Sequence, residues 1–277
     1  MQLEPPILDF GEKSMRRIVA NGLLACCGLA AAEEPPVSPV VINVTLASDY
    51  LFRGISQTQE KHAIQGGLTY THDSGFHGSV WGSNINFKPK DKPNPDNDNA
   101  ELELDYGAGY GGKFSDALTW DLSAIYYSYP GSKPQGHTQY GYWEVLPTAV
   151  YDLGRAKITG QFAYSPDFFG PAKSGMYLMA GLDVPLPNDF ALNAHLGEQW
   201  LKSDKDLPIS QTFVDANTSY LPKSYTEWKL GVSKQISGFG VELAYFSTSL
   251  SKDKCQAFAG QRDLCSARAM LTLSKNF

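Results

Sequence analysis

The feature that most constrains this fold is a strict alternation of apolar and charged residues, which is clearest in the stretch 101–110, ELELDYGAGY. Every second residue there is apolar or aromatic, and the first three residues between them are carboxylates. A period of two is that of a β-strand whose faces meet different surroundings. Carboxylates cannot point into lipid or a dry core, so this face needs water.

The alternation recurs along the chain from residue 40 to residue 277. We expect strands at about 40–53, 63–71, 76–87, 101–110, 118–126, 140–151, 157–164, 174–184, 190–199, 225–232, 241–248 and 267–277. Links after odd-numbered strands are mostly long and polar, and links after even-numbered strands are tight turns. Outer-membrane barrels show this asymmetry, with short periplasmic turns and longer extracellular loops.

These segments therefore predict an all-β fold, a transmembrane antiparallel up-and-down β-barrel over residues 40–277 with about twelve strands of the length that crosses a bilayer. A soluble β-sandwich is the competing fold, but its strands are shorter and its loops lack the asymmetry. The mean hydropathy of -0.28 does not oppose a membrane barrel, because only every second residue meets lipid. The net charge of -6 and the lack of a basic stripe argue against nucleic acid as a partner.

The first 32 residues have the sequence features of a signal peptide. A basic start at 15–17 precedes an apolar run at 18–29 and small residues at 30–32. Met15 is an alternative translation start, and lipoprotein processing at Cys26 is a competing interpretation. Residues 33–39 form a Pro-rich lead-in. We expect a protein that a Gram-negative bacterium exports to its outer membrane.

Two cysteines remain after the signal peptide, Cys255 and Cys265. In an exported chain the compartment is oxidising, so we expect a disulfide that closes one loop. No histidine lies near either cysteine, which argues against a metal site there. We expect no cofactor.

Several runs carry a family resemblance. They are ASDYLFRGISQ at 47–57, QGG at 65–67, SGF at 74–76, WGSN at 81–84, YSPDFF at 164–169 and the terminal Phe277. In these runs the chain resembles the TorF-type porins of proteobacteria. The resemblance implies an outer-membrane barrel with a channel role. It also implies insertion through the C-terminal strand, with Phe277 as the signal for the barrel-assembly machinery, and it names no solute.

The polar faces predict a lumen lined by charged side chains, in which acids outnumber bases. The candidate residues for solute contact are Asp49, Arg53, Glu101, Glu103, Asp105, Glu144, Lys157, His195, Glu227, Lys229, Glu242 and Arg268. A pore lined by Asp and Glu favours cations. The alternative is that these charges pair across the lumen and close it. Asp49 and Arg53 are close enough along one predicted strand for a local ion pair.

We therefore predict a passive, weakly cation-selective channel for small solutes or ions, surrounded by outer-membrane lipid. The alternative is a non-conducting surface barrel whose loops at 88–99, 201–222 and 249–265 bind an external partner. Nothing in the sequence marks a subunit interface, and a narrow barrel can work as a monomer.

Sequence patterns typical of enzymes are weak. The G-x-G-x-x-G match at 107–112 is followed by no helix. An outer-membrane lipase would need Ser, His and Asn or Asp together on the lipid face. His195 falls on a polar face, however, and His72 and His77 fall at a predicted turn. No Gly-x-Ser-x-Gly elbow is present. The acidic stretch 101–105 lies on one strand, which gives poor metal geometry, so we predict neither catalysis nor a metal site.

Overall fold

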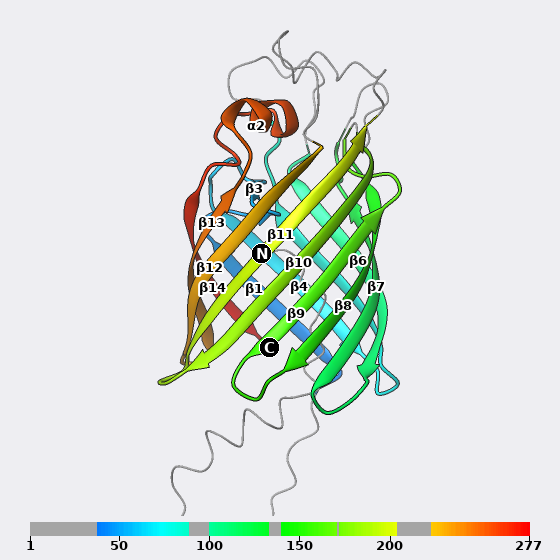
Figure 1. The fold of residues 1–277 in the computed structure, drawn as a ribbon, viewed down its shortest axis with the longest axis vertical. Helices are drawn as coiled ribbons and strands as arrows, with labels where there is room; N and C mark the ends of the chain where they lie inside the picture. The colour runs from blue at the N-terminus through cyan, green and yellow to red at the C-terminus, as the bar shows by residue number, and fades with distance from the viewer. Residues whose placement is uncertain (1–37, 89–99, 133–139, 171, 204–222) are drawn as a thin grey trace, which may run out of the picture.

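The computed structural model describes residues 38–88, 100–132, 140–170, 172–203 and 223–277. Twelve long antiparallel strands close into one barrel (Figure 1). They are β1 (Val40–Ala47), β4 (Ala63–Thr71), β5 (Phe76–Asn84), β6 (Leu102–Lys113), β7 (Leu118–Ser128), β8 (Tyr142–Asp152), β9 (Lys157–Ser165), β10 (Ala172–Leu186), β11 (Phe190–Ser203), β12 (Ser224–Ile236), β13 (Phe239–Thr248) and β14 (Arg268–Asn276). The predicted fold class is confirmed. The proposed signal peptide and the loop stretches 89–99 and 204–222 lie outside the described residues.

The barrel closes between its first and last strands. β1 pairs with β4 on one side and with β14 on the other, with Asn43 opposite Asn276. Beyond β14, Phe277 and Ile42 exchange backbone hydrogen bonds of 3.2 and 2.9 Å. A closed sheet has no free edge and satisfies the backbone polar groups of its strands, which a lipid environment demands.

The outward faces of the strands are apolar, as the alternation predicts. Exposed Val, Leu and Ile side chains cover the middle of the barrel wall, among them Val44, Leu68, Val80, Leu178 and Leu243. Exposed aromatic side chains gather near both ends: Phe76, Tyr110, Phe114, Tyr151 and Phe239 near one, and Trp143, Tyr164, Trp200, Trp228 and Tyr245 toward the other. An apolar band between two aromatic girdles is the surface of a transmembrane barrel.

The two ends of the barrel differ. At the short-turn end, tight turns such as 72–75 and 153–156 join the strands, and the chain ends there at Phe277. At the long-loop end lies α2 (Lys252–Ala259), at the top of Figure 1. No helix among the described residues is long and apolar enough to cross a membrane.

The expectation that the first strand runs to Arg53 is wrong. β1 ends at Ala47, and residues 48–62, here called the in-folded segment, enter the barrel. The segment contains a small hairpin of β2 (Leu51–Phe52) and β3 (Ile55–Ser56). Its two turn residues, Arg53 and Gly54, have φ of 46° and 79°. Two left-handed residues in succession make the tight hairpin turn that matches the strand twist, so a spanning strand cannot continue through them.

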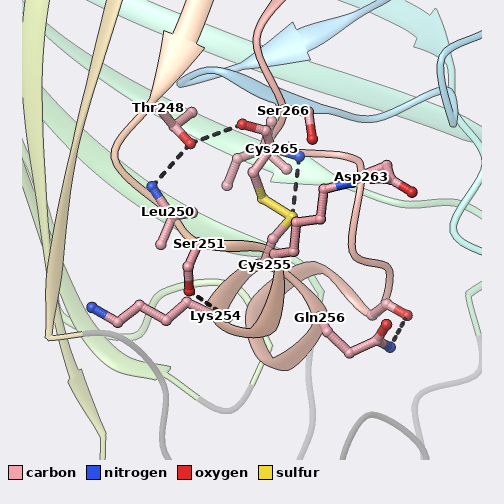
Figure 2. The surroundings of a disulfide bond; sticks show 12 residues. Thr248, Leu250, Ser251, Lys254, Cys255, Gln256, Asp263, Cys265 and Ser266 are labelled. Carbon is pink, nitrogen blue, oxygen red and sulfur yellow. Dashed lines mark hydrogen bonds and ion pairs between the residues drawn. A yellow bond between two sulfur atoms is a disulfide. The ribbon is translucent and has the colours of Figure 1, made fainter.

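The last long loop is also more ordered than its sequence suggested. Ser251 caps the start of α2 by accepting a hydrogen bond from the Lys254 amide, and Gly260 ends the helix with φ of 78°. The predicted disulfide between Cys255 and Cys265 is present (Figure 2). The Thr248 hydroxyl donates to the Cys265 carbonyl at 2.9 Å, which ties the disulfide to the end of β13.

Replacing both Cys255 and Cys265 with serine should lower the free energy of unfolding by about 2–3 kcal/mol, because the cross-link restricts the unfolded loop. The measurement is urea unfolding of the barrel in lipid vesicles. Wild-type protein treated with a reductant is the matched control and should show the same loss. An unchanged midpoint in both samples would show that the cross-link contributes nothing to stability.

Candidate functional site

The in-folded segment is held inside the barrel by a network centred on Asp49. This carboxylate accepts hydrogen bonds of 2.7 Å from Ser56 and from Thr58, and it pairs with Arg268 of β14 at 2.8 Å. The Ser56 amide also donates to the Leu264 carbonyl at 3.0 Å, in the loop that follows α2. The segment is thereby joined both to the barrel wall and to the α2 loop.

Arg53, at the tip of the hairpin, lies in the middle of the lumen. Its guanidinium forms an ion pair of 2.7 Å with Glu144 of β8 and donates at 2.5 Å to Gln199 of β11. The side chains of Arg53 and Glu144 are both 0% exposed. The guanidinium also lies over the rings of Tyr177 and Phe52, at 4.3 and 4.8 Å from their centroids. Arg53 therefore bridges the in-folded segment to three strands of the wall.

This arrangement separates two cavities within the described part of the barrel. The short-turn chamber has a volume of about 360 Å³ and is lined by Arg53, Asp183, His195, Glu227, Lys229 and Glu242, among others. The long-loop chamber has a volume of about 110 Å³ and is lined largely by aromatic side chains, including Phe52, Phe87, Tyr140 and Phe169. The hairpin lies between them, because Arg53 borders the first chamber and its neighbour Phe52 borders the second.

Several charged side chains that face the lumen are paired with a side chain of a nearby strand. The pairs besides those of Arg53 and Asp49 are Lys229–Glu242 at 2.7 Å, His195–Glu227 at 3.0 Å and His77–Asp121 at 2.6 Å. Tyr177, which stacks under Arg53, donates to Glu227. A continuous polar network therefore runs from the hairpin into the short-turn chamber.

An acidic surplus remains on β6. Glu103 and Asp105 are each 1% exposed, and neither forms an ion pair with a base among the described residues. Glu103 accepts a hydrogen bond from the Tyr50 hydroxyl at 3.1 Å. Oδ1 of Asp105 and Oε1 of Glu144 are buried and lack a hydrogen-bond partner in the described structure. Glu103 and Asp105 therefore lie on the inward face of β6 without a basic partner among the described residues.

Three expectations about single residues need correction. Asp49 and Arg53 do not pair with each other, because the hairpin turn sends Arg53 to Glu144 and leaves Asp49 beside β14. Glu101 precedes β6 and is exposed, and the hydrogen bond from Lys88 holds its pKa below the ordinary value. It therefore lies outside the lumen.

The third correction concerns His77, which lies inside the barrel on β5 and not at a turn. Its partner Asp121 also accepts a hydrogen bond from Ser123. The serine therefore contacts the carboxylate and not the imidazole, which differs from a nucleophile activated by a histidine base. No cluster of His, Cys, Asp or Glu that could hold a metal ion occurs among the residues described.

The remaining predicted residues lie on the inward faces of their strands. They are Glu103, Asp105, Glu144, Lys157, His195, Glu227, Lys229, Glu242 and Arg268. Sequence analysis missed the uncharged partners of Arg53, namely Gln199, Tyr177 and Phe168. The period of two places Gln199 and Tyr177 on inward faces, but nothing in the sequence shows that Arg53 reaches them.

Comparison with known proteins identifies the family. The family model described as a bacterial protein of unknown function, Gcw_chp, matches residues 31–277. The chain belongs to the Gcw_chp family. No curated protein matches it by sequence. The resemblance to the TorF-type porins is not confirmed by this family model.

The solved structures that this chain resembles in fold include porins. A KdgM porin is 9% identical with a TM-score of 0.52, and the match covers 86% of this chain and 99% of that chain. A KdgM porin in complex with disordered oligogalacturonate is 10% identical with a TM-score of 0.51, over 86% and 99% of the two chains. A NanC porin is 9% identical with a TM-score of 0.51, over 84% and 97%. At these identities the likeness concerns the fold alone.

Proposed function

We propose that this protein is an outer-membrane channel that lets small solutes or ions pass passively, with a weak preference for cations. The observation that carries the proposal is a closed barrel that is apolar outside and has a polar, charged chamber inside. A wall of this kind separates lipid from an aqueous path. The carboxylates that line the short-turn chamber are Asp183, Glu227 and Glu242, and its Lys and Arg side chains are Lys229 and Arg53. This surplus of acids in the lining favours cations over anions in that path.

The in-folded segment makes this a narrow channel. Barrels of about eight strands are filled by side chains, and those of 16–18 strands leave a wide channel. A barrel of twelve strands lies between these cases, and here the hairpin occupies the centre of the lumen. The constriction around Arg53 and Glu144 limits the path to small solutes.

The loop asymmetry gives the orientation. Short turns face the periplasm and long loops face the cell exterior in outer-membrane barrels. A solute from outside would therefore meet the long-loop chamber first, pass Arg53, and reach the short-turn chamber with its ion pairs.

Planar bilayers test the proposal. We expect discrete conductance steps, and under a gradient of KCl a reversal potential whose sign marks K⁺ as the more permeant ion. Heat-denatured protein added to the same bilayer is the control. A silent bilayer would support the other candidate, a surface barrel without conduction, which is favoured by the buried Arg53–Glu144 pair that fills the lumen centre. A reversal potential of anionic sign would contradict the selectivity.

A further inference from the structure

The long-loop chamber is a box of aromatic rings. Phe87 meets Tyr140 at 89° and Phe169 at 73°, with centroids 5.9 and 5.6 Å apart. Tyr129 also stands edge-on to Tyr140, at 83°. The other aromatic side chains in the wall are Phe52, Tyr142, Phe168, Tyr225 and Phe258. Tyr140 and Phe169 are stacked at 17° with centroids 5.0 Å apart, so rings of this wall stand both parallel and edge-on to one another.

No charged side chain lines this chamber among the residues described. Its polar groups are the tyrosine hydroxyls, Ser56 and the amides of Gln57, Asn86 and Gln261. An anionic solute would find neither Lys nor Arg in the lining, and the negative π-faces of the rings would repel it. The lining therefore disfavours anions and accepts a cation or a neutral group.

Two of the rings in the chamber wall already contact a cation, the guanidinium of Arg53. The Arg53 guanidinium lies 4.8 Å from the centroid of Phe52 and 5.8 Å from that of Phe168, and both rings line the chamber.

The size of the chamber restricts its occupant. Its volume is about 110 Å³, whereas pockets for drug-sized ligands begin at roughly 300 Å³. A disaccharide does not fit in such a space, but a single compact head group does. A trimethylammonium group carries positive charge over an apolar surface and needs no hydrogen-bond acceptor, which is what an aromatic cage recognises.

We propose that the long-loop chamber binds small quaternary ammonium compounds and is the entry site for such solutes. As a statement about a transported solute this rests on the proposed channel function, whereas binding can be measured without conduction. The rings around Tyr140 and Phe169 form the binding site.

Ligand-observed NMR on the full barrel in detergent micelles tests it, with saturation transfer to the methyl protons of choline. The matched neutral probe is 3,3-dimethylbutan-1-ol, which has the shape of choline without the charge. We expect saturable binding of choline in the millimolar range and at least about tenfold weaker binding of the neutral probe, which corresponds to about 1.4 kcal/mol. This comparison uses only the wild-type protein, so it does not depend on the folding of a variant.

A double variant, Tyr140→Leu with Phe169→Leu, removes the stacked ring pair and should weaken choline binding about tenfold. Tyr245→Leu, on the outward face of β13, is the control and should bind as wild type does. Equal binding of the two probes, no saturation, or equal loss in the variant and the control would each overturn the proposal. If the barrel conducts K⁺ but does not bind choline, only this inference is contradicted. If it binds choline but shows no conductance, only the proposed channel function is contradicted.

Discussion

Replacing Arg53 with alanine should increase the single-channel conductance about twofold or more, because the side chain fills the narrowest part of the lumen. The same change should lower the free energy of unfolding by about 3–5 kcal/mol, because Glu144 becomes a buried carboxylate without its counter-charge. The guanidinium also contacts Gln199, Phe52 and Tyr177, and these contacts are lost together. Conductance in planar bilayers and urea unfolding in vesicles measure the two effects.

Two further variants distinguish the effect of a wider path on conductance from the effect of the lost ion pair on stability. Arg53→Ala combined with Glu144→Gln should regain part of the stability, since no charge is left unpaired, while its conductance stays raised. Arg155→Ala removes an exposed arginine from the turn at 153–156 and should change neither quantity. If Arg53→Ala conducts as wild type does, the hairpin does not set the constriction.

Removing two acids from the short-turn chamber should weaken or reverse the cation preference. Glu242 pairs with Lys229 at 2.7 Å, and Asp183 accepts a weak hydrogen bond of 3.4 Å from Asn193. Asp183→Asn with Glu242→Gln leaves the Lys229 ammonium without its partner in the chamber. We expect the ratio of K⁺ to Cl⁻ permeability to fall about twofold or more, because fixed charges lining a pore set its selectivity.

The salt concentration decides how well this effect is seen. Screening acts over about 10 Å at 0.1 M salt but only about 3 Å at 1 M, so the reversal potential should be measured near 0.1 M KCl. Asp116→Asn, in the exposed turn at 114–117, removes one acid outside the lumen and should leave the ratio unchanged. An unchanged ratio in the double variant would show that ions do not pass these side chains.

The barrel itself was predictable because its physical cause is local. A side chain that faces lipid must be apolar and its neighbour that faces the lumen is free to be polar, so each strand shows the period of two. The sequence 101–110 shows this alternation, and β6 places Glu103 and Asp105 inward. Strand ends were also predictable where turn residues such as those at 153–156 interrupt the pattern.

The in-folded segment was not predictable in the same way. Tyr50 and Phe52 continue the period-two apolar pattern of Val44 and Leu46, as a spanning strand would, so periodicity alone cannot separate the two. The local signal is the Arg53-Gly54 pair, which sits where a tight hairpin needs left-handed residues. The partners Glu144 and Gln199 lie 91 and 146 residues away, and only the closed barrel brings them together. The helix α2 was missed because a short capped helix leaves no period-two pattern.

The hydrogen bond from the Ser56 amide to the Leu264 carbonyl joins the hairpin to the loop after α2. The hairpin carries Arg53 inside the barrel, and α2 stands at the long-loop end (Figure 1). A force that pulls on α2 is therefore transmitted to the hairpin through this hydrogen bond as well as through the barrel wall.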